Sequence, residues 1–186
     1  MRTFIAIALT EEAHEELSSL QDSLRKSGAD IKWVKPDHIH LTLKFLGEID
    51  EEQAAEIKAS IDETVKNQKP FDIHLAKIGA FPRIAFPKIV WVGIDEGSQG
   101  CMALAKSVEE AMQRLGFEKE KRPFSPHLTL GRVRSLKNNS QLTSAVEKEK
   151  DFSSQTKVSI NKITLFQSTL TPKGPIYTPL KEFSLE

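Results

Sequence analysis

A repeated tetrapeptide constrains the fold of this chain more than any other feature. His-Leu-Thr-Leu occurs at residues 40–43 and again at residues 127–130, so 127 − 40 = 87 residues separate the two histidines. Successive side chains of a strand point to opposite faces, so each copy places its histidine and threonine on one face and both leucines on the other. The repeat predicts two strands with a polar outer face and an apolar inner face.

The repeat extends beyond the tetrapeptide. A shift of 87 residues also aligns residues 4–7 with residues 91–94, and Pro36 with Pro123. Solenoids repeat every 20 to 50 residues or so, whereas one repetition of a longer unit indicates two related lobes. We therefore expect residues 1–186 to form one bilobal domain, with sequence halves near 1–86 and 87–186 and terminal strands free to cross between lobes. One histidine from each lobe would meet in a cleft.

Composition limits the function classes. The chain has 186 residues, of which 39% are hydrophobic and 28% charged. A chain of this length and composition can bury a substantial core and does not need disulfide bonds or metals to hold its fold. Its 26 basic and 26 acidic residues give no net charge, which argues against a general nucleic-acid binder. Any RNA would be held locally. Basic residues near the two motifs could contact it or form a solvated surface; they are Lys32, Lys35, Lys44, Lys119, Lys121, Arg122, Arg132 and Arg134.

Location can also be inferred from the sequence. Cys101 is the only cysteine, so no intrachain disulfide is possible. The apolar run at residues 4–9 is too short for a signal peptide, and nothing reaches membrane-spanning length. We expect an intracellular, cytoplasmic protein without membrane contact. A monomer is compatible with the sequence, which leaves the oligomeric state open.

Hydrophobic periodicity predicts an alternation of strands and helices. The expected strands are 4–9, 31–34, 38–46, 71–78, 88–94, 127–133, 157–166 and 177–185, and the expected helices lie around 13–24, 54–65, 104–115 and 142–146. Asp50 and Gln53 resemble a helix-capping pair, and Pro82 and Pro87 mark an irregular connection. No glycine-rich loop follows the first strand, so we favour an α+β fold with largely antiparallel sheets over a doubly wound parallel sheet.

Three stretches of sequence carry a family resemblance. They read HLTLKFLG at 40–47, SPHLTLGR at 125–132, and GPIY at 174–177 followed by Leu180. Together they resemble the bacterial and archaeal RNA 2′,3′-cyclic phosphodiesterases, also called 2′-5′ RNA ligases, of the 2H phosphoesterase superfamily. The resemblance covers nearly the whole chain, and paired His-x-Thr-x motifs are highly specific.

That resemblance implies a pseudo-twofold α+β fold with helices outside and a central cleft. It implies metal-independent hydrolysis of a 2′,3′-cyclic phosphate on an RNA end, tRNA fragments included, to a 2′-phosphate without a cofactor. In the family the first histidine donates a proton and the second accepts one, which assigns His40 as donor and His127 as acceptor. The duplicated motif alone leaves this assignment open.

Two histidines suit this chemistry. Water must lose a proton as it attacks phosphorus, and the departing ribose oxygen must gain one on the opposite side. Because the pKa of histidine lies near 6.5, one imidazole can be neutral while the other is charged. Positioned acid–base catalysis contributes roughly 10²–10⁴-fold. We expect a bell-shaped pH–rate profile.

The other motif residues suggest phosphate contacts. Thr42 and Thr129 share the histidine faces and could donate hydrogen bonds to non-bridging oxygens, although each alone could be an ordinary strand threonine. Arg132 lies five residues after His127 and would point away from it in a regular strand, unless Gly131 permits a bulge or a strand end. The family has an arginine here as a phosphate ligand, and the first copy has Phe45 instead.

Several further residues have a functional and a structural interpretation. His38 shares the face of His40, but the sequence offers no ligands that would complete a metal set. His14 and His74 are expected at the surface or in structural roles. Aromatic rings that could stack on a base, and for which core packing is the favoured role, are Trp33, Phe124 and Tyr177.

Three functions from different classes stay open. The first is the RNA cyclic phosphodiesterase, with reverse 2′-5′ ligation if a ribose hydroxyl replaces water. The second is a 2H phosphoesterase for a small cyclic or nucleotide phosphodiester. The third is a non-catalytic RNA-end binder, which the intact histidines and threonines of both motifs disfavour.

Overall fold

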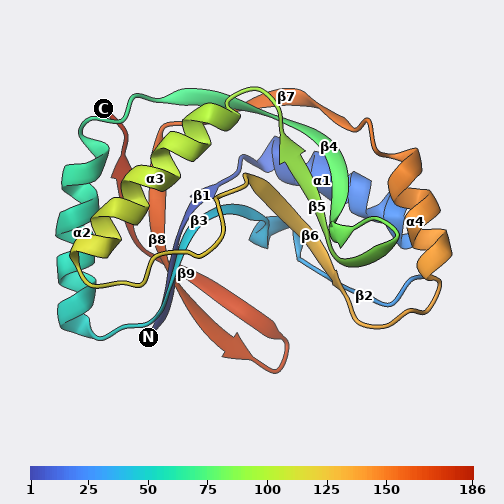
Figure 1. Cartoon of the computed structure of the whole chain (residues 1–186), viewed down its shortest axis with the longest axis horizontal. Coiled ribbons are helices and arrows are strands. Elements are labelled where there is room, and N and C mark those ends of the chain that lie inside the picture. The colour runs from blue at the N-terminus through green and yellow to red at the C-terminus, as the bar shows by residue number, and fades with distance from the viewer.

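The computed structural model describes residues 1–186 as two antiparallel sheets with four α-helices (Figure 1). In chain order the elements are β1 (Arg2–Ala8), α1 (Glu11–Arg25), β2 (Ile31–Trp33), the 3₁₀ turn η1 (Pro36–His38), β3 (His40–Glu48), α2 (Glu51–Val65), β4 (Phe71–Arg83), β5 (Phe86–Ile94), α3 (Ser98–Arg114), β6 (His127–Val133), α4 (Asn139–Lys148), β7 (Ser153–Ile160), β8 (Lys162–Thr171) and β9 (Gly174–Ser184).

The two sheets form the two lobes of the molecule. The first sheet has the strand order β3-β1-β8-β9 and the second has β2-β6-β5-β4-β7, with antiparallel pairing throughout. Helices α2 and α3 lie beside the first sheet, and α1 and α4 beside the second (Figure 1). The expected α+β class with antiparallel sheets is confirmed.

The halves of the sequence exchange elements between the two sheets. Strand β4 belongs to the first half of the sequence but pairs with β5 of the second half, and β8 belongs to the second half but pairs with β1 of the first. Helix α1 likewise contacts α4 and β7, while α3 contacts β3. A division near residue 86 therefore separates the two copies of the repeat in sequence, whereas each sheet is built from both copies.

Pairing registers show where the offset of 87 applies. The offset of 87 relates the motif strands β3 and β6. Their partner strands β1 and β5 are offset by 93 − 8 = 85, because His40 pairs with Ala8 and His127 pairs with Gly93. Phe4 therefore corresponds to Ile89, and the alignment of residues 4–7 with residues 91–94 is two residues out of register. A shift of two keeps every side chain on the same face of a strand, so the apolar pattern could not reveal it.

Both motif strands contain the same β-bulge. On β3, Thr42 pairs with Ala6 and Lys44 with Ile5, so Leu43 has no partner of its own. On β6, the pairing likewise passes from Thr129 directly to Gly131. In each strand the second motif leucine and the residue after it are therefore both buried, which interrupts the alternation. The bulge expected near Gly131 is confirmed, and it has a counterpart in the first lobe.

Gly131 has a packing role at its bulge. A Cβ at this position would lie 2.6 Å from Cγ2 of Ile31 and 3.1 Å from the ring of Trp33, both on β2. Any side chain would therefore push β2 away from β6. The same site of the other bulge holds Lys44, whose side chain is buried against α3.

Local sequence signals explain most element boundaries. Asp50 accepts a hydrogen bond from the Gln53 backbone and the Gln53 side chain accepts one from the Asp50 backbone, so the expected capping box is confirmed. The single strand expected over residues 157–166 is wrong, because Asn161 separates β7 and β8 and these belong to different sheets. The proline-containing stretch expected between the strands at 71–78 and 88–94 is shorter than predicted, because β4 continues to Arg83 and β5 begins at Phe86, with Pro82 and Pro87 paired beside a register shift.

One apolar core joins the two sheets. It comprises 36 buried side chains and includes all four motif leucines, namely Leu41, Leu43, Leu128 and Leu130. Their burial confirms the inward apolar face that the repeat predicts. None of the helices has the length and hydropathy that a bilayer crossing requires.

Candidate active site

The two motif strands approach each other between the sheets. Cα atoms of β3 and β6 come within 8 Å, although the strands are not hydrogen-bonded neighbours. His40 and Thr42 on β3 alternate with buried leucines, and His127 and Thr129 do so on β6. The fold therefore brings together two strands that are 87 residues apart, each with a polar face.

Both imidazoles are held by the same backbone contact. Nδ1 of His40 lies 2.7 Å from the carbonyl oxygen of His38, and Nδ1 of His127 lies 2.7 Å from that of Ser125. A carbonyl only accepts hydrogen bonds, so each Nδ1 carries the proton. Nε2 is then the nitrogen left to exchange a proton with a substrate in both histidines.

Aromatic rings surround His40. The ring of Phe4 stacks on it at 4.8 Å, Phe166 lies at 6.4 Å, and the edge of Tyr177 meets it at 5.3 Å between ring centroids. The pKa of His40 is lowered to about 4, mainly by burial and to a smaller extent by the nearby His38 and His14, against the opposing effect of the hydrogen bond to the His38 carbonyl. His40 is therefore neutral near pH 7 in the free protein.

His127 has different surroundings. It meets the ring of Phe81 edge-on at 5.0 Å. Phe81 and Phe166 correspond through the offset of 85, and each packs on the histidine of the other half of the sequence. The position that corresponds to Phe4 is Ile89, so His127 lacks the stacked ring that covers His40.

Arg132 returns to the outer face of β6 because of the bulge. It is exposed, and it pairs with Lys32 and Ile89 on the neighbouring strands. Burial raises the pKa of the Tyr177 hydroxyl, and the charges of Arg132 and Arg2 oppose that rise. Since Tyr177 also contacts His40, the charge of Arg132 reaches the side of the site that the first lobe forms.

Helix α1 supports both motif strands through His14, for which a surface or structural role was expected, and Gln21, which sequence reasoning missed. Nε2 of His14 lies 3.0 Å from the carbonyl oxygen of Ile39, next to His40. The buried Gln21 amide donates to the carbonyls of Val34 and Leu130 at 2.8 and 2.9 Å. His14 and Gln21 are seven residues apart, so they share one helix face. Polar residues on the apolar stripe of this helix were the available signal.

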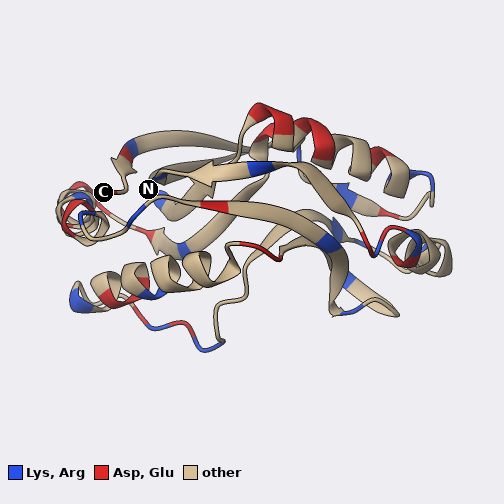
Figure 2. Ribbon diagram, turned by 90° about the horizontal axis from the view of Figure 1, so that it is seen from above, with Lys and Arg blue, Asp and Glu red and all other residues tan.

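The remaining candidates have structural partners. The Arg25 guanidinium lies 5.1 Å over Trp33, and Phe124 packs against the core. His74 bonds to Asp95 at 2.7 Å and to the Ser154 carbonyl at 3.0 Å. His38 contacts the Tyr177 ring at 5.0 Å, and no three His, Cys, Asp or Glu side chains are grouped as a metal site would require. Lys and Arg are interspersed with Asp and Glu over the ribbon in Figure 2.

Comparison with known proteins places the chain among the 2H phosphoesterases. The family model described as "LigT like Phosphoesterase" matches residues 7–91 and residues 92–177. The two matches start 92 − 7 = 85 residues apart, in agreement with the pairing register of β1 and β5. The chain belongs to the LigT-like phosphoesterase family.

Curated relatives and solved structures agree with this assignment. The chain is 38% identical over 183 residues to the RNA 2′,3′-cyclic phosphodiesterase of Methanocaldococcus jannaschii, covering 98% of this chain and all of the relative. It is 34% identical to the protein of the same name from Thermotoga maritima, over 100% of this chain and 96% of the relative.

Among solved structures, the protein TT0787 of Thermus thermophilus superposes with a TM-score of 0.82 at 28% identity, covering 100% of this chain and 98% of that one. E. coli LigT complexed with 3′-AMP gives a TM-score of 0.79 at 26% identity, over 99% and 97% of the two chains.

Proposed function

We propose that the protein hydrolyses the 2′,3′-cyclic phosphate at the end of an RNA to a 2′-phosphate, with His40 and His127 as the acid–base pair. One observation supports this most directly. In both histidines Nδ1 hydrogen-bonds to the backbone carbonyl oxygen of the residue two positions earlier, so the two imidazoles are oriented in the same way. The family membership and the names of the curated relatives support the substrate class. The cytoplasmic location belongs to the same proposal.

Each group has one role in the proposed step. Nε2 of His127 takes a proton from water as the water oxygen bonds to phosphorus. The bond between phosphorus and the ribose 3′ oxygen breaks, and Nε2 of His40 protonates that oxygen. Thr42 and Thr129 donate hydrogen bonds to the non-bridging oxygens, and the Arg132 guanidinium neutralises the charge that develops on them.

The burial of His40 sets a condition on its role as donor. A pKa of about 4 leaves its imidazole neutral in the free protein at neutral pH, whereas a donor must be protonated. The negative charge of a bound cyclic phosphate raises the pKa of an adjacent histidine. In this proposal the bound substrate raises the pKa of His40, so His40 takes up a proton when the substrate binds.

Hydrolysis can be tested with an oligoribonucleotide that ends in a 2′,3′-cyclic phosphate. We expect turnover by the wild-type protein and losses of about 10²–10⁴-fold in kcat for His40→Ala and for His127→Ala. His74→Ala is the matched control, because His74 bonds to Asp95 away from the site. Turnover that survives both replacements would refute the assigned pair. An RNA with a free 5′ hydroxyl in the same assay tests 2′-5′ ligation.

The two roles can be separated with a substrate that carries sulfur in place of the 3′ bridging oxygen. A thiolate leaves without prior protonation, because the pKa of a thiol is near 8.5. His40→Ala should regain most of its lost rate on this substrate, and His127→Ala should not. Rescue of His127→Ala instead would reverse the assignment of donor and acceptor.

A further inference from the structure

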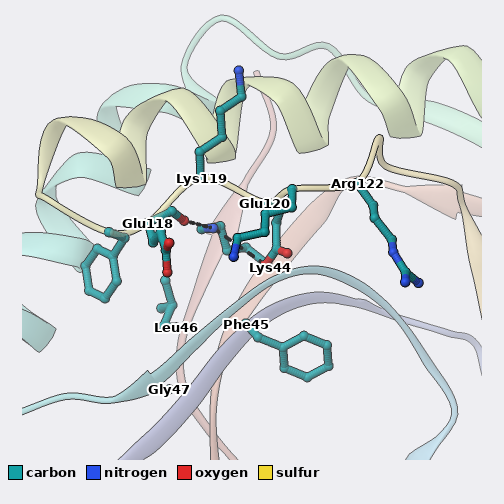
Figure 3. Close-up of a pocket in the computed structure, with 10 residues that line it drawn as sticks. Lys44, Phe45, Leu46, Gly47, Glu118, Lys119, Glu120 and Arg122 are labelled. Atoms are coloured by element: carbon teal, nitrogen blue, oxygen red, sulfur yellow. Dashed lines mark hydrogen bonds and ion pairs between the residues drawn. The ribbon is translucent and has the colours of Figure 1, made fainter.

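A groove opens beside the far end of the catalytic strand β3. It has a volume of about 440 Å³ and lies between residues 44–47 of that strand and the loop at 117–122, which follows α3 (Figure 3). The groove and the proposed site share strand β3, which also carries His40 and Thr42. It plays no part in the proton transfers.

The loop that forms the outer wall is held in place by a buried ammonium group. The Lys44 side chain is 2% exposed, and its Nζ donates to Glu109 at 3.1 Å and to the carbonyl of Glu118 at 2.9 Å. Glu120 lies at 3.7 Å from the same nitrogen. The wall is therefore anchored to the catalytic strand and to α3, so the groove is a built feature of the fold.

Phe45 gives the groove an aromatic surface. It is 60% exposed, because the bulge turns it to the outer face where the second copy of the repeat has Arg132. Its ring centroid lies 6.2 Å from that of Phe4, which lies 4.8 Å from His40, so the Phe45 and His40 centroids are at most 6.2 + 4.8 = 11.0 Å apart. An exposed aromatic ring at this distance is a stacking surface beside the reacting phosphate.

The loop across the groove from β3 carries three basic and two acidic side chains. Lys119, Lys121 and Arg122 line the groove together with Glu118 and Glu120, and Glu120 is near Lys44. Arg122 extends on the same side as Phe45, whereas the Lys119 side chain runs away from β3 (Figure 3). The groove thus pairs a stacking ring with a guanidinium, which can hold a phosphate by two hydrogen bonds.

We infer that this groove holds the penultimate nucleotide of the RNA, with its base on Phe45 and the phosphate that joins it to the terminal nucleotide at Arg122. The inference rests on the proposed function. A cyclic mononucleotide has a single phosphate, which lies between the histidines, so a ligand that also engages Arg122 needs a second phosphate. The pairing of the two groups therefore selects a chain over a mononucleotide.

The test compares two substrates, adenosine 2′,3′-cyclic phosphate and the dinucleotide ApA that ends in the same cyclic phosphate. The quantity measured is the ratio of their kcat/KM values. We expect Phe45→Ala to lower the dinucleotide preference about tenfold, the range that loss of one base stack produces. Phe86→Ala, which removes another exposed ring (56%) on the β4–β5 hairpin, should keep the wild-type ratio.

Arg122→Ala and Arg114→Ala each remove one guanidinium and form a second matched pair, because Arg114 is exposed at the end of α3 and does not line the groove. Only Arg122→Ala should lower the preference, and it should reduce the salt dependence of dinucleotide binding by about one phosphate contact. If Phe45→Ala lowers kcat/KM equally on both substrates, so that the ratio is unchanged, the terminal base lies there. If it changes neither kcat/KM value, there is no subsite at Phe45. Either result overturns the inference.

A binding readout separates this inference from the proposed activity. Fluorescein-labelled hexa-adenylate with a 3′-phosphate is titrated with wild type, Phe45→Ala and Phe86→Ala, and anisotropy is recorded. Weaker binding in Phe45→Ala alone supports the subsite even if no cyclic phosphate is hydrolysed. Equal binding by all three proteins refutes the subsite even if hydrolysis is observed.

Discussion

The buried state of His40 predicts a specific loss of stability in mild acid. Its folded pKa of about 4 lies below the usual 6.5. As pH falls from 6.5 towards 4 the unfolded chain binds a proton at this position before the folded protein does, so stability present above pH 6.5 is lost over that window. At about 1.4 kcal/mol per pKa unit the full loss approaches roughly 3 kcal/mol, of which about 2 kcal/mol falls between pH 7 and pH 5.

The measurement is urea unfolding of wild type and His40→Asn at pH 7 and pH 5. Asparagine has an amide nitrogen that can reach the His38 carbonyl and does not titrate, while all other titrations are shared by the two proteins. Wild type should therefore lose about 2 kcal/mol more than His40→Asn over this interval. Equal losses, or an NMR titration that places the pKa of His40 near 6.5, would refute the link between the aromatic ring cluster and the neutral imidazole.

Other predictions follow from single contacts. Arg132→Lys should raise KM and lower kcat/KM about tenfold in steady-state assays with the cyclic phosphate substrate, because an ammonium lacks the two-pronged guanidinium geometry. Lys44→Met should lower the free energy of unfolding by about 3–5 kcal/mol in urea, since it leaves Glu109 partly buried without its partner; Glu109→Leu in the same chain should recover part of that loss. Asp95→Asn should lower the pKa of His74 in an NMR titration, because the hydrogen bond to Asp95 is the main cause that raises it. That raised pKa stabilises the wild-type fold at low pH, and the effect is lost as pH rises through the folded pKa.

The sequence predicted those features that depend on local pattern. Alternation placed His40 and Thr42 opposite the motif leucines, and Gly131 correctly indicated the bulge that turns Arg132 outward. The break at Asn161 was missed although the apolar positions change parity there, from Val158 and Ile160 to Ile163 and Leu165. That β7 and β8 belong to different sheets follows only from their long-range pairing. The positions of His14 and Gln21 on the apolar stripe of α1 indicate buried polar contacts, but their partners depend on how α1 packs.

The exchange of elements between the two sequence halves explains how a symmetric repeat yields two unlike histidines. Because β4 and β8 cross over, each histidine packs against a phenylalanine of the other half, Phe81 on His127 and Phe166 on His40. This exchange alone would keep the two sites equivalent. The difference arises where the copies diverge in side chain, as Phe4 stands where the second half has Ile89, and where β9 adds Tyr177 at the edge of the first sheet. Both changes add apolar surface around His40, and burial is the main cause of its lowered pKa. The fold thus retains matched hydrogen bonds that orient both imidazoles while giving one of them a drier environment. In the proposed mechanism this drier environment has a consequence for the donor, because the bound phosphate must raise the pKa of His40 before its imidazole can donate a proton.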